Sequence, residues 1–169
     1  MNAITITGGY GALRSVRRYN SSGGMEVLPE MNIGRYGHGC AQFRSSEGVK
    51  VLLVTGGREG NHASSSTEIL YLGSHRWTVV GDLPLPLMGL RGATLDNVVY
   101  MAGQYFSTQI NIQSTAVTGG DSAGCDQTIV LRYKMVSKMW EKVGNMTTPR
   151  SWHAVQTVRF SHYEDHCML

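Results

Sequence analysis

The chain has 169 residues, of which 41% are hydrophobic and 16% charged, and its formal net charge is +3. That length is enough for one domain with a buried core. The charged residues form no block of like sign, which argues against nucleic acid as the main partner. No apolar run approaches the roughly 20 residues that span a bilayer, so we expect no membrane segment. Residues 1–9 also lack the basic and apolar regions of a signal peptide.

The cysteines indicate the compartment. Cys40, Cys125 and Cys167 form no spacing motif, and three thiols cannot all pair with one another. Free thiols are typical of a reducing environment. We therefore expect a cytoplasmic protein.

Short apolar runs bounded by glycine recur along the chain and predict strands. Helices would need about ten residues or more of continuous pattern, and no stretch keeps a 3.6-residue apolar period. The 21 glycines also interrupt any longer helix. The expected strands, in chain order, are 4–7, 14–19, 24–29, 36–43, 50–55, 67–72, 76–81, 92–95, 98–102, 128–134, 139–143 and 151–158. The predicted fold class is all-β.

These strands belong to an internal repeat. Each unit has an arginine, a strand that closes on a glycine pair, a tyrosine and then a tryptophan. The members are Arg35, Gly56, Gly57, Tyr71 and Trp77 in the fullest copy; Arg91, Gly103, Tyr133 and Trp140 in the next; Gly8, Gly9 and Tyr19 in a partial first copy; and Arg150 in a partial last copy. Glycine permits tight turns, while tyrosine and tryptophan can fill the space between neighbouring sheets. Units of this length predict the blades of a β-propeller.

The order of these residues resembles the kelch repeat over about residues 4–158. The resemblance implies four-stranded antiparallel blades. Two copies depart from the pattern: no tryptophan follows Tyr19, where Met25 or Val27 would have to fill the space, and Gln104 follows Gly103 in place of a second glycine. We predict a partial propeller of about three blades plus one extra strand. Its parts are residues 1–31, 32–84, 85–146 and 147–160, together a domain 1–160, with a non-repeat tail at 161–169.

Three blades would leave an open arc. Kelch propellers typically close about five to seven blades into a ring, which removes unpaired strand edges. We therefore favour a fragment of a longer kelch protein, although self-association through the open edge strands is an alternative.

One segment breaks the repeat. Gly103 and Tyr133 are 30 residues apart, whereas Gly57 and Tyr71 are 14 apart. The added stretch, 105–126, could be a binding loop. Alternatively, Gly119 and Gly120 form the true glycine pair and the insertion precedes it.

Loops carry the expected binding function. Equivalent loops of all blades converge on one end of a propeller, and the kelch resemblance implies that they bind partner peptides. One set follows the glycine pairs (10–12, 58–66 and 104–125), and the other enters the blades (32–35, 87–91 and 147–152). The predicted partner-binding residues are Arg35, Arg58, His62, Ser64, Arg91, Gln104, Tyr105 and Arg150. Guanidinium groups suit an acidic peptide. A repeat arginine can equally brace its own turn by binding backbone carbonyls.

We find no catalytic residues, metal site or cofactor motif. His162, His166 and Cys167 lack a fourth zinc ligand, and the residues after Gly8 do not continue the dinucleotide-binding glycine pattern. The expected function is protein interaction, which the resemblance extends to substrate recognition in a cullin ubiquitin-ligase adaptor or to actin and cytoskeleton binding. The alternative is an enzyme on a kelch-like propeller, such as a copper oxidase or a sugar-acid isomerase.

Overall fold

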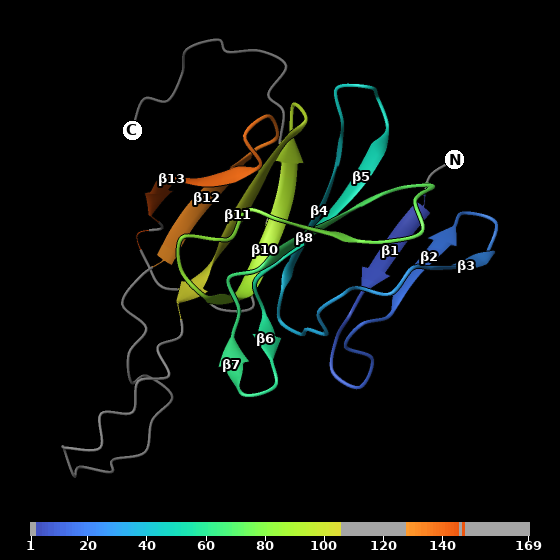
Figure 1. The fold of residues 1–169 in the computed structure, drawn as a ribbon, viewed down its shortest axis with the longest axis horizontal. Helices are drawn as coiled ribbons and strands as arrows, with labels where there is room; N and C mark the ends of the chain where they lie inside the picture. The colour runs from blue at the N-terminus through green and yellow to red at the C-terminus, as the bar shows by residue number, and fades with distance from the viewer. Residues whose placement is uncertain (1–2, 106–127, 146, 148–169) are drawn as a thin grey trace, which may run out of the picture.

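The computed structural model describes residues 3–105, 128–145 and 147. The predicted strand at 151–158, Arg150, most of the 105–126 insertion and the 161–169 tail lie outside these residues. Within them the chain forms thirteen strands and no helix. The prediction of an all-β, partial kelch-type propeller is confirmed: antiparallel sheets of three or four strands stand side by side and do not close into a barrel (Figure 1).

Three sheets correspond to three blades. Blade 1 contains β1 (Ala3–Thr7), β2 (Val16–Asn20) and β3 (Met25–Leu28); blade 2 contains β4 (Gly39–Arg44), β5 (Lys50–Thr55), β8 (Thr67–Tyr71) and β9 (Thr78–Val80); blade 3 contains β10 (Leu87–Leu95), β11 (Val98–Tyr105), β12 (Thr128–Lys134) and β13 (Met139–Asn145). Each strand pairs with its neighbours in this order. A small hairpin of β6 (Arg58–Glu59) and β7 (His62–Ala63) projects from blade 2, where the sequence predicted only a loop (Figure 1).

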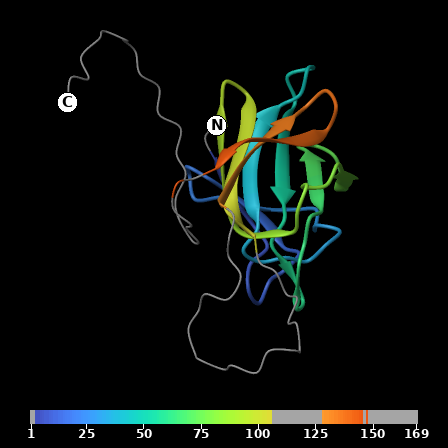
Figure 2. The same ribbon diagram turned by 90° about the vertical axis from the view of Figure 1, so that its left-hand side faces the viewer.

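The first strands of blades 2 and 3 lie side by side. The turn between β10 and β11 places Asp96 and Asn97 at positive φ, the geometry of a two-residue hairpin turn. The Asn97 side chain accepts a hydrogen bond from the Arg44 amide (2.6 Å) and donates one to the Arg44 carbonyl (2.8 Å). The sheets are stacked face to face, so their strands overlap in Figure 2.

Apolar side chains fill the two spaces between the blades. The cluster between blades 1 and 2 holds Val16, Leu28, Met31, Leu52, Val54, Leu70 and Trp77. The cluster between blades 2 and 3 holds Phe43, Val51, Leu53, Ile69, Leu83, Leu87, Leu90, Val99, Met101, Ile129, Leu131, Tyr133 and Trp140. The Trp77 indole donates to the Pro29 carbonyl (2.8 Å) and the Trp140 indole to the Thr67 hydroxyl (2.9 Å). Each tryptophan therefore packs against the preceding blade.

Strand register corrects the repeat alignment at the tyrosine position. Leu52 lies four residues before Gly56 and pairs with Leu70, just as Val99 lies four before Gly103 and pairs with Tyr133. Leu70 therefore occupies the position of Tyr133, and both lie seven residues before a tryptophan. Tyr71 is one residue out of phase, which places it on the opposite face of the sheet, 38% exposed. In blade 1, Tyr19 holds the tyrosine position, and Met25 lies opposite it on β3.

The arginine alignment also changes. The Gly9 amide donates to the Arg35 carbonyl (3.0 Å), and in the next blade the Gly57 amide donates to the Leu87 carbonyl (2.7 Å). Leu87 therefore holds the position of Arg35. Arg91 lies four residues further on, within β10. The prediction that Arg35 and Arg91 share equivalent sites is wrong, because the alignment rested on residue type and the backbone hydrogen bonds set a different register.

Candidate functional site

Loops from blades 1 and 2 meet at the end of the arc where the glycine pairs lie. The Arg35 amide donates to the Leu13 carbonyl (2.8 Å), and the Met31 amide donates to the Arg14 carbonyl (3.0 Å). Tyr36 and Arg58 exchange two backbone hydrogen bonds, which attach the β6–β7 hairpin to the same entry loop. The loop after the blade 1 glycine pair and the loop entering blade 2 therefore share one surface.

Arg35 is fully buried at this junction, with 0% exposure. Its Nη1 donates to the Gly56 carbonyl (2.7 Å) and the Ser66 carbonyl (3.1 Å). Its Nη2 donates to the Ser66 hydroxyl (2.8 Å) and to Glu68 Oε1 (2.9 Å). The guanidinium braces the turn, so Arg35 is removed from the predicted partner-binding residues.

Glu68 is the buried counterion of Arg35. Its Oε2 accepts a hydrogen bond from the Asn32 amide (2.8 Å), and its Oε1 accepts one from the Ile33 amide (3.1 Å). The carboxylate thus ties blade 2 to the loop that leaves blade 1. Sequence analysis missed this residue, although one acid within the apolar stretch Thr67–Leu70 was a visible signal.

The other predicted partner-binding residues are dispersed. Ser64 contacts the Ser66 hydroxyl (2.9 Å) within a packed segment, and the hairpin turns at Gly60 and Asn61. Ser64 therefore lies away from the tip of the hairpin. Those that remain are Arg58, half-buried on β6; His62, exposed on β7; Arg91, half-buried in β10; and Gln104 and Tyr105, at the end of β11.

An open groove of about 870 Å³ lies between the blade 1 loop and the hairpin. Tyr10 is 92% exposed at its rim, and its ring meets the ring of Tyr36 edge to face, with centroids 5.8 Å apart. The Arg14 Nε donates to the Met31 carbonyl (2.7 Å), which holds this side chain beside the groove. The lining residues are Tyr10, Gly11, Ala12, Leu13, Arg14, Ser15, Glu30, Tyr36, Gly60 and Asn61. Tyr10 was within a loop predicted to bind, but neither tyrosine was predicted as a contact.

His38 lies behind this surface, between two glycine turns. Its Nε2 is 2.8 Å from the Thr7 hydroxyl, and its buried Nδ1 has no hydrogen-bond partner in the part of the chain that the structure describes. Burial and, to a smaller extent, the positive charge of Arg35 together lower the pKa of His38 to about 4. Among the described residues no carboxylate orients the ring, so the Thr7–His38 pair has no third group of a nucleophilic triad there.

His38 should make stability depend on pH. Because its folded pKa of about 4 is below the unfolded value, its contribution is complete above about pH 6.5 and is lost as the pH falls towards 4. The full shift corresponds to at most about 3 kcal/mol, and for this partly exposed ring we expect about 2 kcal/mol. Urea unfolding at about pH 7 and pH 4.5 measures the loss. The loss should shrink in His38→Gln and persist in His75→Gln, whose side chain is exposed. An unchanged loss in His38→Gln would refute this assignment.

The described residues contain neither a metal site nor a membrane-spanning helix. No group of three or more His, Cys, Asp or Glu side chains there could hold a metal ion. The same part of the chain has no helix with the length and hydropathy needed to cross a membrane.

Comparison with known proteins gives a distant likeness. No family model matches the chain. Two curated relatives, both named "Kelch repeat and BTB domain-containing protein 2", come from the Brighton Red and GRI-90 strains of cowpox virus. They are 26% and 27% identical over 157 residues, which is 87% of this chain and 27% of each relative. The chain therefore spans about a quarter of the relatives' length. The likeness suggests a kelch-like family.

Proposed function

We propose that this chain is a kelch-type protein-interaction module that binds a peptide segment of a partner at its loop end. The observation that carries the proposal is the exposed Tyr10, packed edge to face on Tyr36 at the rim of an open groove. A tyrosine offers a large contact area at low conformational cost and is enriched among residues that dominate binding energy.

The lining residues favour a peptide with one apolar and one acidic side chain. Tyr10, Tyr36 and the part-exposed Leu13 offer an apolar surface. The Arg14 guanidinium is held beside them and can receive a carboxylate. This proposal keeps the acidic partner predicted from the sequence but moves its site from Arg35 to Arg14.

The wider role follows from the relatives' name, which joins kelch repeats to a BTB domain. The kelch resemblance of this sequence extends to cullin ubiquitin-ligase adaptors. We propose that the module recognises substrates, as in a cullin ubiquitin-ligase adaptor, rather than carrying out catalysis. Cytoskeletal binding through the same loops is the variant within this class.

A peptide selection tests the site directly. Random peptides displayed on phage are selected on the immobilised chain, and enriched sequences are made with a fluorescent label for anisotropy titration. Tyr10→Ser should weaken binding at least tenfold, about 1.4 kcal/mol, because it removes the main contact area. Arg14→Gln should weaken the binding of a peptide that carries the acidic side chain. It should leave unchanged the binding of the same peptide in which that acid is replaced by its amide.

Tyr71→Ser is the matched control. Tyr71 is also an exposed tyrosine, but it does not line the groove, so its replacement should leave affinity unchanged. Equal affinity of Tyr10→Ser and the unaltered chain for every selected peptide would refute the proposed site.

A further inference from the structure

β1 is an unprotected sheet edge. It pairs with β2 on one side, and no described strand pairs with its other side. Its sequence, Ala3–Thr7, contains no charge, proline or bulge, which are the usual means of preventing edge-to-edge association. The other terminal strands of the three sheets are protected by a charged residue or by short length: Glu26 in β3, Arg44 in β4, Arg91 in β10, Glu141 and Lys142 in β13, and three residues in all for β9.

One face of the same sheet is largely apolar and exposed. Ile4 is 71% exposed and Ile6 is 55% exposed, and Met25 and Val27 are exposed on β3. Tyr19 and the exposed Arg17 lie between these two pairs on β2. The equivalent positions in blade 2, Leu52 and Val54, are buried against blade 1. Side chains that pack between blades elsewhere are therefore uncovered here.

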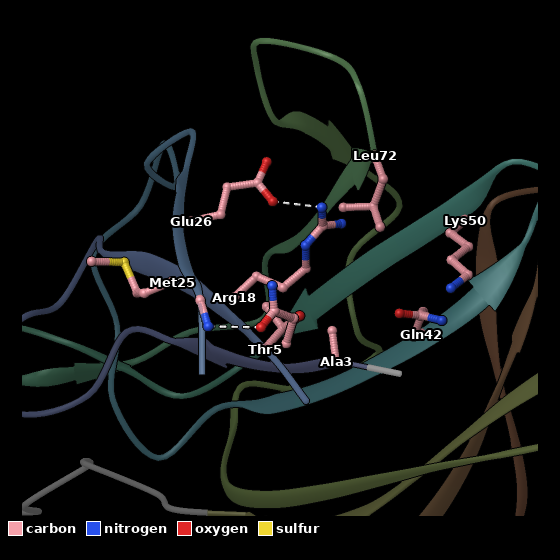
Figure 3. A pocket seen from close by; sticks show the side chains of 10 residues that line it. Ala3, Thr5, Arg18, Met25, Glu26, Gln42, Lys50 and Leu72 are labelled. Atoms are coloured by element: carbon pink, nitrogen blue, oxygen red, sulfur yellow. Dashed lines mark hydrogen bonds and ion pairs between the residues drawn. The ribbon is translucent and has the colours of Figure 1, made fainter. Parts of the chain in front are cut away.

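There is also room beside the edge. A hollow of about 620 Å³ separates β1 from blade 2, with Ala3 and Thr5 on one side and Gln42 and Lys50 on the other (Figure 3). The side chains of a strand added to β1 could enter this hollow. Arg18 and Glu26, which form an ion pair, line it further out.

We propose that β1 pairs with β1 of a second copy of this chain, antiparallel and across a twofold axis at Thr5. In this register Ile4 lies opposite Ile6 of the second copy, Thr5 opposite Thr5, and Ala3 opposite Thr7. Isoleucine meets isoleucine on the exposed face. On the face towards blade 2, Thr5 meets Thr5, with an Ala3–Thr7 pair on either side. The two blade 1 sheets become one six-stranded sheet, and the isoleucine pairs supply the cross-strand packing that stabilises such sheets. The surface is separate from the peptide groove, so the proposal is independent of the proposed function.

The oligomeric state of the full chain tests this pairing. Sedimentation equilibrium should give twice the 18.5 kDa chain mass. Ile6→Lys alone and Ile4→Glu alone should each raise the dimer dissociation constant at least tenfold, because each places an unpaired charge opposite an isoleucine. An equimolar mixture of the two variants should recover dimer, because one lysine then lies opposite one glutamate.

Thr78→Lys is the control, since Thr78 is exposed on β9 and should leave the dimer intact. Thermal unfolding verifies that each variant is folded. If the charged variants do not fold, Thr5→Cys with the native cysteines changed to serine should form a disulfide-linked dimer under mild oxidation. A monomeric chain, a dimer insensitive to both charges, or no cross-link at Thr5 would each overturn the proposal.

Discussion

Arg35→Leu is expected to lower the free energy of unfolding by about 3–5 kcal/mol. The substitution leaves the Glu68 carboxylate fully buried without its counterion, and breaking a buried pair from one side has a cost of this size. It also removes the donors to Gly56 and Ser66. Most single domains have only about 5–15 kcal/mol of stability, so the loss should be visible as a large drop in the urea midpoint.

The equivalent apolar pair in the next blade suggests a double variant that should restore part of this stability. At the junction of blades 2 and 3, Leu87 holds the position of Arg35 and Leu131 holds that of Glu68, and both are fully buried. The double variant Arg35→Leu with Glu68→Leu should therefore lose less free energy of unfolding than Arg35→Leu alone, because apolar pairs can replace buried ion pairs. A residual cost of about 1–3 kcal/mol is expected because the Asn32 and Ile33 amides lose their acceptor.

Arg76→Leu, at an exposed arginine, is the control and should change stability by less than about 0.5 kcal/mol. A double variant less stable than both singles would show that the pair contributes more than the mutual neutralisation of two buried charges.

Strand positions were largely predictable from the sequence. The expected strands 50–55 and 128–134 match β5 and β12, because short apolar runs have few other ways to bury their side chains. The β6–β7 hairpin was missed because Arg58 to Ala63 is short and polar. Arg58 also forms a bridge with Tyr36, which is distant in the sequence and gives no local signal.

The repeat alignment was harder because residue type does not follow position. The buried junction site is occupied by Arg35 in one blade and Leu87 in the next, so aligning arginines moved the register by four residues. A better signal was available in the dipeptides Arg18-Tyr19 and Arg132-Tyr133. Both arginines pair with a glutamate directly across the next strand, at Glu26 and Glu141.

The peptide groove could not have been derived from the sequence. Tyr10 lies directly after the glycine pair, but the loops that form the groove are brought together by backbone bonds such as Arg35 to Leu13. Those bonds depend on the buried Arg35 and Glu68. Arg35 was predicted to bind a partner. It instead holds in place the loops that we propose bind the partner.

Gly56→Ala should be nearly as destabilising as Arg35→Leu, with a loss of about 3 kcal/mol in the free energy of unfolding. Gly56 has a φ of +63°, where a side chain is strained by about 1–2 kcal/mol. An added Cβ would also lie 2.6 Å from the Leu87 carbonyl oxygen and against the Leu90 side chain, and backbone at that distance cannot move without disturbing blade 3. The two costs have separate origins and should add.

Gly60→Ala separates those two costs. Gly60 has a similar φ of +56°, but it is at the tip of the hairpin, and no described residue lies within 4 Å of the position a Cβ would take. Its substitution should cost only the backbone strain, about 1–2 kcal/mol. Urea unfolding of both variants gives the difference, which measures the contact between the blade 2 glycine turn and Leu87. Equal losses in the two variants would mean that the blades can separate at this turn without cost, and the close packing that places the loop end would then contribute nothing to stability.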